Sequence, residues 1–436
     1  MTDVVSDHGR KLGWGLAALV VAGNMIGSGL YLLPVTLADF GSSSLIGWLV
    51  AGVGAAVLAL VFGALGRLKP HADGLAGFAQ TGLGRFFGFQ VAIAFWTACL
   101  VGNVAVAVAA TGYLAFFWPA LKDPVAATLC NLAIIWVATL AYIAGTRTAS
   151  WLAAGALIVG LIPIAIAVAA GVAAFDAELF AASWNPTGEP LKETVPASLV
   201  LIFWAYLGVE SAAALSSRIR HPGKNLGRAS LAGVALATVV YVGATVSVFG
   251  VIPLNELSQS TSPYADLAAR VFGASLAGFV AVCAVAKTIG TVGGWVMMGG
   301  ETARAAAKAG FLPKGFAEGD KTPLVNPLTG AAIMTIVAIL SGQPTLGEQF
   351  GMLVGVTSVL TLTIYGVCSA ALIRLSPGTG GHVLGAFGLM FAGAAVIAAA
   401  AGYILPTLAV VALTTLAWFT VLRGGKPAVD PAGEGA

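Results

Sequence analysis

The segment Gly23-Asn24-Met25-Ile26-Gly27-Ser28-Gly29 lies inside the first long apolar run of the chain. A second such segment, Phe203-Trp204-Ala205-Tyr206-Leu207-Gly208-Val209-Glu210-Ser211, lies inside the sixth run. Glycine weakens a helix and permits backbone conformations that other residues avoid. We therefore expect two helices that are interrupted near their middle. The alternative is that these glycines only allow close packing between continuous helices.

The composition around these segments is typical of an integral membrane protein. Of 436 residues, 58% are hydrophobic and 9% are charged, and the mean hydropathy is +0.95. Soluble domains carry about a quarter charged residues. The net charge of +3, without a dense basic run, argues against a nucleic-acid partner. The partners expected are the lipid bilayer and a small molecule.

Neither the cysteines nor the histidines form a pattern typical of a metal or catalytic site. The cysteines lie in apolar runs and the histidines in polar connections: Cys99, Cys130, Cys283, Cys368, His8, His71, His221 and His382. We therefore expect no metal and no cofactor. The first ten residues lack the charge pattern of a cleavable signal sequence, so the first apolar run is expected to stay as a span.

Twelve apolar runs are long enough to cross a bilayer core of about 30 Å, which needs roughly 20 residues per helix. Because lipid offers no hydrogen bonds to the backbone, these runs are expected to be α-helices. They cover residues 13–38, 43–66, 86–118, 125–144, 150–175, 195–216, 229–252, 273–303, 326–342, 351–374, 384–402 and 404–422. Residues 1–424 are therefore expected to form one transmembrane domain, followed by a cytoplasmic tail at 425–436.

The basic residues predict the orientation of these spans. With both termini in the cytoplasm, 17 of the 21 lysines and arginines fall in inner segments. Only Lys122, Lys192 and Arg270 fall in outer segments, and Lys287 lies within a span. This asymmetry agrees with the positive-inside rule. It predicts a protein with both termini on the cytoplasmic side.

The two interrupted runs occupy corresponding positions in spans 1–5 (about 13–175) and spans 6–10 (about 195–374). Because each repeat contains an odd number of spans, the two repeats cross the membrane in opposite directions. Paired broken helices in inverted repeats are typical of transporters that bind substrate near the membrane midplane. The last two runs, at about 384–422, would then be peripheral helices.

Unwound backbone at Gly27-Ser28-Gly29 would expose N–H groups at the positive end of a half-helix, which favours a carboxylate. Carbonyl groups released near Met25, Ile26 and Leu207 can accept hydrogen bonds from an ammonium group. An α-amino acid presents both groups. The same backbone could instead bind an inorganic ion.

Two charged residues are isolated within predicted spans. Glu210 is the only acidic residue between Glu193 and Glu256. A carboxylate at membrane depth usually faces an aqueous path or a partner, so Glu210 is a candidate for proton sensing or cation attraction. The alternative is a structural group bonded to nearby backbone. Three roles are open for Lys287: a fixed cation in place of sodium, a group that loses its proton during transport, or a static partner of Glu210.

Trp204, Trp295 and Asn103 are further candidates, because they adjoin glycines inside spans. An indole face can pack against an aliphatic chain or a cation. The amide of Asn103 can bind a substrate head group or bridge two helices.

Together these segments resemble the amino acid–polyamine–organocation superfamily, and within it the bacterial arginine/agmatine antiporters. The resemblance runs from Gly13 to about Arg423. Its most specific stretches are Gly23 to Gly29, Trp96 to Asp123 with Gly102-Asn103, Gly112-Tyr113-Leu114 and Leu121-Lys122-Asp123-Pro124, then Trp204 to Ser211, and Gly293-Gly294-Trp295.

The resemblance implies an all-α, LeuT-like fold of ten core helices in two inverted five-helix repeats, with two peripheral helices, usually as a homodimer. It also implies roles. The amides of Ser28 and Gly29 would receive the substrate carboxylate, and carbonyls near Met25 and Leu207 the α-amine. Trp204 would cap the site from outside. The distal guanidinium or amine would be held by Trp295, Asn103, Thr357 and the carbonyls of Ala98 and Cys99. Glu210 and Tyr365 would form part of an outer gate and of proton sensing.

The sequence departs from the family pattern at four positions. Where the family pattern has a gating tyrosine, a serine and a pocket methionine, this sequence has Phe95, Thr357 and Val106, respectively. Lys287 replaces a small residue. A cation near the site would repel a dicationic substrate unless it is paired or screened.

We therefore expect a sodium-independent antiporter of the bacterial inner membrane rather than an enzyme. It would exchange a basic amino acid, preferably arginine, for its decarboxylated amine, agmatine, by alternating access. The alternative is a neutral amino acid exchanger or a proton-coupled symporter that uses Lys287 and Glu210. Without a histidine in a span, a hydrolase has no base, and a receptor would show no countertransport.

Overall fold

The computed structural model describes residues 12–27, 30–145, 159–214, 219–317 and 324–422. This described part is built of helices, with isolated β-bridges at Leu12–Ile219 and Gly41–Trp184. Its elements are α1 (Trp14–Met25), α2 (Leu33–Thr36), α3 (Ser44–Leu68), α4 (Gly74–Leu83), α5 (Arg85–Leu114), η2 (Pro119–Lys122), α6 (Pro124–Ala144), α8 (Leu161–Ala174), α9 (Ala177–Ala182), α10 (Leu191–Phe203), η3 (Trp204–Tyr206), α11 (Ser211–Ala214), α12 (Pro222–Phe249), α13 (Leu254–Leu257), α14 (Pro263–Phe272), α15 (Ala274–Lys308), η4 (Lys314–Phe316), α16 (Val325–Leu340), α17 (Leu346–Leu375), α18 (Thr379–Ile397), α19 (Ala401–Ala417) and η5 (Trp418–Leu422).

Eight helices in the described part are long and apolar enough to cross a membrane: α3, α5, α6, α12, α15, α17, α18 and the stretch Ala401–Thr420. The shorter apolar helices α1, α8 and α16 fall on three further predicted spans. The sixth predicted span falls on α10 and α11. The structure also contains the short helices α4, α9, α13 and α14 in regions where the sequence predicted polar connections.

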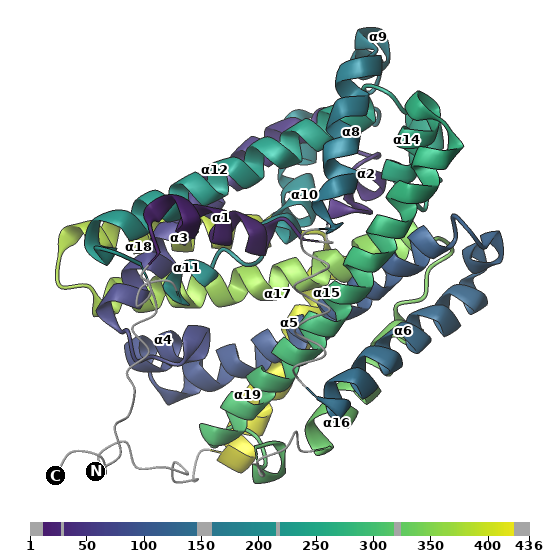
Figure 1. The fold of residues 1–436 in the computed structure, drawn as a ribbon. Helices are drawn as coiled ribbons and strands as arrows, with labels where there is room; N and C mark the ends of the chain where they lie inside the picture. The colour runs from purple at the N-terminus through teal and green to yellow at the C-terminus, as the bar shows by residue number, and fades with distance from the viewer. Residues whose placement is uncertain (1–11, 28–29, 146–158, 215–218, 318–323, 423–436) are drawn as a thin grey trace, which may run out of the picture.

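Helices α5 and α17 form the centre of the bundle. In their most apolar stretches 83% and 78% of the residues are buried, against 22% for α18 and 11% for α19. Helix α5 packs against α15 and α17, while α12 packs against α1 and α3. The last two helices, α18 and α19, are therefore the least buried of the eight (Figure 1).

Local sequence explains how the α5–α6 connection ends. The Asp123 carboxylate accepts hydrogen bonds from the backbone N–H groups of Val125 and Ala126, each at 3.0 Å. Pro124 occupies the first helical position, where its missing N–H costs nothing. Asp123 in the Leu121-Lys122-Asp123-Pro124 motif is thus the N-cap of α6.

The first apolar run is interrupted where the sequence predicts it. Helix α1 ends at Met25, and Ile26 leaves the helical region with φ −71° and ψ 77°. The N–H of Gly27 donates to the carbonyl of Met25 at 2.7 Å, which closes a tight turn. Helix α2 begins at Leu33. Ser28 and Gly29 lie outside the described residues.

The sixth run is interrupted in the same way. Helix α10 ends at Phe203 and continues as the single 3-10 turn η3. Leu207 is extended, with ψ 137°, and Gly208 has φ +105°, which favours glycine. Helix α11 then begins at Ser211.

Candidate functional site

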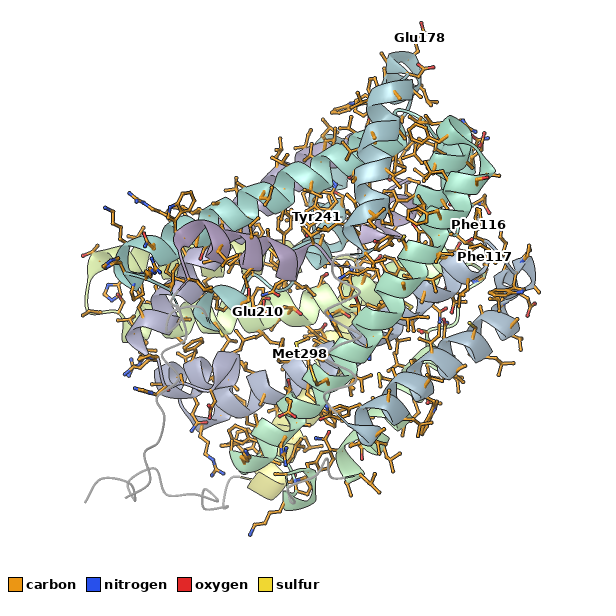
Figure 2. The ribbon with its side chains drawn as sticks, viewed as in Figure 1. Phe116, Phe117, Glu178, Glu210, Tyr241 and Met298 are labelled. Carbon is orange, nitrogen blue, oxygen red and sulfur yellow. The ribbon has the colours of Figure 1, made fainter. Side chains whose placement is uncertain are left out.

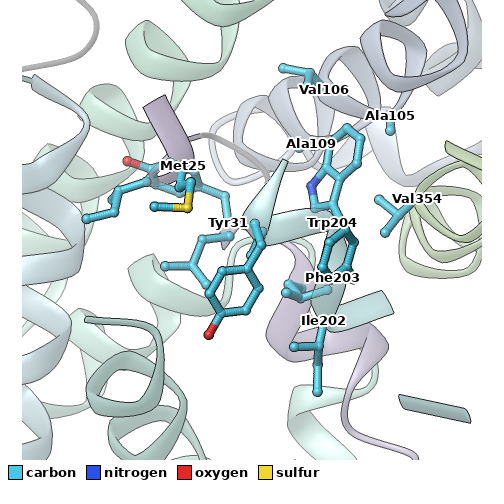
Figure 3. Close-up of a cluster of buried hydrophobic side chains, with 14 of the residues drawn as sticks. Met25, Tyr31, Ala105, Val106, Ala109, Ile202, Phe203, Trp204 and Val354 are labelled. Carbon is cyan, nitrogen blue, oxygen red and sulfur yellow. The ribbon is translucent and has the colours of Figure 1, made fainter. Parts of the chain in front are cut away.

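The two interruptions touch each other. A Cβ atom added to Gly208 would lie 2.7 Å from the carbonyl oxygen of Asn24, so only glycine permits this approach. Figure 3 shows Met25 at the end of α1 and Trp204 after α10 in the same buried cluster, with Tyr31 between them. The unwound backbone at Gly208 is therefore brought against the last turn of α1 inside the bundle.

Glu210 connects the second interruption to α17. Its Oε2 atom accepts a hydrogen bond from the backbone N–H of Gly208 at 3.0 Å and another from the hydroxyl of Tyr365. Tyr365 is fully buried and packs edge-on against Phe62, with ring centroids 4.8 Å apart. Figure 2 shows Glu210 within the bundle, close to α17. Glu210 and Tyr365, to which the resemblance assigns gating and proton sensing, are thus hydrogen-bonded to each other, and Glu210 also bonds to nearby backbone.

An aromatic pair lies beside the interruption. The rings of Trp204 and Trp295 have centroids 5.5 Å apart, and Trp204 also packs edge-on against Phe350 at 6.5 Å. A Cβ atom added to Gly102 would lie 2.5 Å from Trp295 and 3.1 Å from Trp204. Gly102 on α5 therefore gives both indoles room to approach the helix.

Asn103 follows Gly102 and is 1% exposed. Its Nδ2 atom donates to the sulfur of Met334 on α16 at 3.4 Å. Its Oδ1 atom and the Nε1 atom of Trp204 are buried without a hydrogen-bond partner among the described residues. A buried polar atom without a partner costs free energy, and a ligand that pairs with it recovers that cost. The amide of Asn103 thus both bridges two helices and offers an acceptor.

The remaining pocket candidates are placed as follows. Ala98 and Cys99 are buried on α5, and Cys99 Cβ lies 3.8 Å from the Cβ position of Gly299 on α15. Thr357 is buried on α17, but its hydroxyl donates to the carbonyl of Leu353 in its own helix at 2.8 Å. Phe95 is partly buried against the core.

The backbone candidates are only partly described. The carbonyl of Met25 already accepts the N–H of Gly27, so an ammonium group would share that oxygen. Leu207 is partly buried at the extended residue of the second interruption. Ser28 and Gly29, the predicted carboxylate site, lie outside the described residues.

Lys287 does not pair with Glu210, and this possibility from the sequence is wrong. The lysine is 6% exposed, and its Cδ atom lies 2.4 Å from the Cβ position of Gly160, just before α8. The hydroxyl of Tyr31 donates to the carbonyl of Gly160 at 2.5 Å. The register of α15 therefore directs Lys287 to the α8 contact near Tyr31, whereas Glu210 is held by Gly208 and Tyr365.

Sequence reasoning missed a cluster of buried tyrosines. Tyr31 packs edge-on against Tyr113 at 5.5 Å and Tyr264 at 5.8 Å between centroids. The Tyr113 hydroxyl donates to the carbonyl of Tyr31 at 3.2 Å, which ties α5 to the chain after the first interruption. The one feature of the sequence that pointed to this tyrosine cluster was the Gly112-Tyr113-Leu114 motif. Within the described residues, no group of three His, Cys, Asp or Glu side chains is arranged to hold a metal.

This geometry defines a class. Two interrupted helices whose bare backbone meets beside buried aromatic and polar side chains are typical of membrane transporters. Known proteins agree. The model of the amino acid permease family matches residues 12–420. The chain is 33% identical to the cadaverine/lysine antiporter of Escherichia coli K12 over 84% of both chains. It is 30% identical to the putrescine transporter PotE of the same strain, over 84% of this chain and 83% of the relative. It is 28% identical to PotE of Haemophilus influenzae, over 85% of this chain and 86% of the relative.

The chain therefore belongs to the amino acid permease family of the amino acid–polyamine–organocation superfamily. It is a transporter and not an enzyme. Its apolar helices and bacterial relatives indicate a multi-pass protein of the inner membrane.

Proposed function

We propose that this transporter exchanges a basic amino acid for its decarboxylated amine, without sodium and by alternating access, with arginine and agmatine as the preferred pair. The observation that carries the proposal is the buried Oδ1 atom of Asn103, which has no hydrogen-bond partner among the described residues and follows Gly102 with its tryptophan pair. An acceptor on the same turn of α5 that contacts the two indoles suits a cationic head group. The printed activities of the relatives, cadaverine/lysine antiport and putrescine transport, support the same substrate class.

In this proposal the substrate lies across the two interruptions. Its carboxylate meets the amides of Ser28 and Gly29, and its α-ammonium meets carbonyls near Met25 and Leu207. The side chain passes between Trp204 and Trp295. Asn103, with Thr357 and the carbonyls of Ala98 and Cys99, receives the distal cation. A planar guanidinium stacks on an indole better than a compact ammonium does, which favours arginine.

Lysine and cadaverine are the second candidate pair, because the relative that carries out this exchange is 33% identical. An ammonium group can also donate to Asn103 Oδ1 and pack over an indole face. The two pairs differ chiefly in the head group, which is a planar guanidinium in one and a compact ammonium in the other.

We further propose twelve spans in two inverted repeats, both termini in the cytoplasm, and a homodimer. Helix α11 leads from the second interruption toward Ile219, which bridges Leu12 near the N-terminal end. Glu210 and Tyr365 therefore fall in the cytoplasmic half of the protein. The gate that they form is an inner one, in contrast to the outer position that the resemblance implied.

We propose that Lys287 takes the place of a sodium ion. It is a buried cation at the contact of α15 with α8, next to Tyr31 in the first interrupted run. Because the side chain of Lys287 lies against Gly160, its positive charge need not face the positively charged head group of the substrate side chain. A neutral amino acid substrate would instead be favoured if Lys287 acted on the substrate directly.

Exchange in proteoliposomes tests the proposal. Vesicles are loaded with agmatine, cadaverine, putrescine, alanine or buffer, and uptake of labelled arginine and lysine is measured with sodium or choline outside. We expect agmatine to accelerate arginine entry most, with or without sodium. If lysine exchanges faster than arginine, lysine and cadaverine are the preferred pair. Acceleration by alanine alone, or a requirement for sodium, would contradict the proposal.

A further inference from the structure

A cavity of about 610 Å³ lies where the end of α5 faces α14. We call it the α14 cavity. One wall consists of the end of α5 and of η2, and the other of residues between Ile252 and Arg270. Figure 2 shows Phe116, one of its lining residues, at this end of the molecule. None of the residues of the candidate substrate site lines it. Its volume is in the range of sites that hold small molecules.

The polar wall carries a carboxylate, Asp266, that accepts hydrogen bonds from neighbouring hydroxyl groups but forms no ion pair with a basic side chain among the described residues. Asp266 is partly buried and accepts hydrogen bonds from the hydroxyl groups of Ser260 and Ser262. Burial raises the pKa of Asp266, although Ser260, Lys122 and Ser262 oppose that effect. Lys122 lines the cavity from η2 and attracts Asp266 without an ion-pair contact. An ammonium group that entered would therefore gain a charge-assisted hydrogen bond with Asp266.

The other two charged side chains neutralise each other. Arg270 contacts the carboxylate of Glu256 at 2.5 Å and also donates to the carbonyl of Val251 at 3.2 Å. The cavity is then lined by one available anion, Asp266, and one available cation, Lys122. A diamine would place a second positive charge near Lys122 and Arg270. A zwitterion matches both charges.

The lining is mixed: Gln259, Ser260, Thr261 and Ser262 are polar, while Ala115, Phe116 and Ile252 provide an apolar surface. This surface suits an aliphatic side chain. The polar wall is also fixed to the core: a Cβ atom on Gly112 of α5 would lie 2.6 Å from the carbonyl oxygen of Thr261. The N–H of Tyr264 donates to the hydroxyl of Tyr113 at 3.4 Å. A molecule in the cavity therefore bridges the end of α5 and a segment that packs directly on α5.

We propose that the α14 cavity binds an α-amino acid with an aliphatic side chain, its ammonium on Asp266, its carboxylate on Lys122 and its side chain against Phe116 and Ile252. This second site is separate from the exchange site and does not depend on which basic amino acid is exchanged.

Protection of a single thiol tests the site. Gln259, which lines the cavity, is replaced by cysteine in the full-length protein in lipid nanodiscs, and Cys130→Ser removes the one native cysteine that is not buried. The rate of maleimide labelling is followed with L-leucine and with isopentylamine, which lacks only the carboxylate. We expect L-leucine to slow labelling and isopentylamine to have no effect.

Variants assign the protection to the cavity. In Asp266→Asn and in Lys122→Gln, the L-leucine concentration that gives half-maximal protection should rise by about ten-fold or more. Each substitution removes a charge-assisted contact. Lys122→Arg, which keeps the charge, should retain protection. Glu178→Gln, an exposed acid on α9, is the matched control and should behave like the parent.

Four results would overturn the proposal: no protection by L-leucine, equal protection by isopentylamine, unchanged protection in well-folded Asp266→Asn, or loss of protection in Trp295→Ala. The last result would place the effect at the exchange site. The labelling signal does not require arginine exchange, so failure of the exchange assay leaves this test intact.

Discussion

The hydroxyl group of Tyr365 donates a hydrogen bond to the carboxylate of Glu210, although the two residues are 155 positions apart. The same carboxylate oxygen accepts the N–H of Gly208 within the second interruption. One ionisable group thus joins unwound backbone to α17. Because a proton on Glu210 would remove the negative charge that strengthens both hydrogen bonds, protonation and movement of the two segments are expected to be coupled.

Glu210→Gln should weaken the pH dependence of exchange, since an amide cannot take up a proton in this range. Exchange is measured in proteoliposomes over acidic to neutral pH. Glu178→Gln on the exposed helix α9 is the control and should keep the parent profile. An unchanged profile in Glu210→Gln would remove this residue from proton sensing.

Trp295→Ala should lower substrate affinity by about ten-fold or more, because it removes an aromatic face worth up to about 2 kcal/mol to a buried cation. Gly102→Ala should also lower substrate affinity, because its Cβ atom would lie 2.5 Å from Trp295. Binding to purified protein is the measurement. Gly299→Ala, whose Cβ atom would be 3.8 Å from Cys99, should bind normally. Parent affinity in Trp295→Ala would contradict its place in the site.

Gly208→Ala should destabilise the protein and slow exchange. Its φ of +105° is strained for alanine, and the new Cβ atom would lie 2.7 Å from the carbonyl oxygen of Asn24. We expect a loss of about 1–3 kcal/mol and a lower Tm. Gly293→Ala is the matched control: its Cβ atom meets nothing within 4 Å, and alanine suits a helix interior. A normal Tm in Gly208→Ala would show that the two backbones do not meet closely.

Lys287→Met should keep or raise the Tm while exchange is strongly reduced. A buried cation without an ion-pair partner costs stability, and methionine removes that cost in a similar volume. Tm and exchange rate per folded protein are measured together. A lower Tm with a normal rate would assign Lys287 a structural role only.

Asp266→Asn should raise the Tm at neutral pH and lose this advantage in acid. Burial raises the pKa of Asp266, so the folded protein holds this proton more tightly than the unfolded chain does. Ionisation therefore costs stability as the pH rises through the unfolded and then the folded pKa, and asparagine avoids the cost. The difference should vanish below about pH 4. A difference that grows in acid would contradict this sign.

Much of the fold was predictable because its signals are local. Apolar runs of sufficient length predict helices in lipid, and α3, α5, α6, α12, α15, α17, α18 and α19 lie on them. The glycine segments predicted where α1 and α10 end, since backbone conformation depends on the residues themselves. The short helices α4, α9, α13 and α14 were not predicted, because their length and polarity resemble those of connections.

The candidate site was predictable only as a set of residues. The resemblance named Glu210 and Tyr365 without giving their hydrogen bond, and it could not show that Gly102 makes room for both tryptophans. It did not show that Met334 holds the amide of Asn103. Such contacts depend on how each helix is rotated about its axis, which many neighbours decide together.

The sequence by itself determined that the chain is helical, embedded in a membrane and broken twice, because chain length, hydropathy and glycine act over a few turns. Only the tertiary structure decided that Gly208 meets Asn24, that Lys287 lies on Gly160 and not on Glu210, and that Asp266 and Lys122 line the same cavity. The two members of each pair come from segments far apart in the chain. Their distances follow from the packing of the whole bundle, which no local pattern encodes.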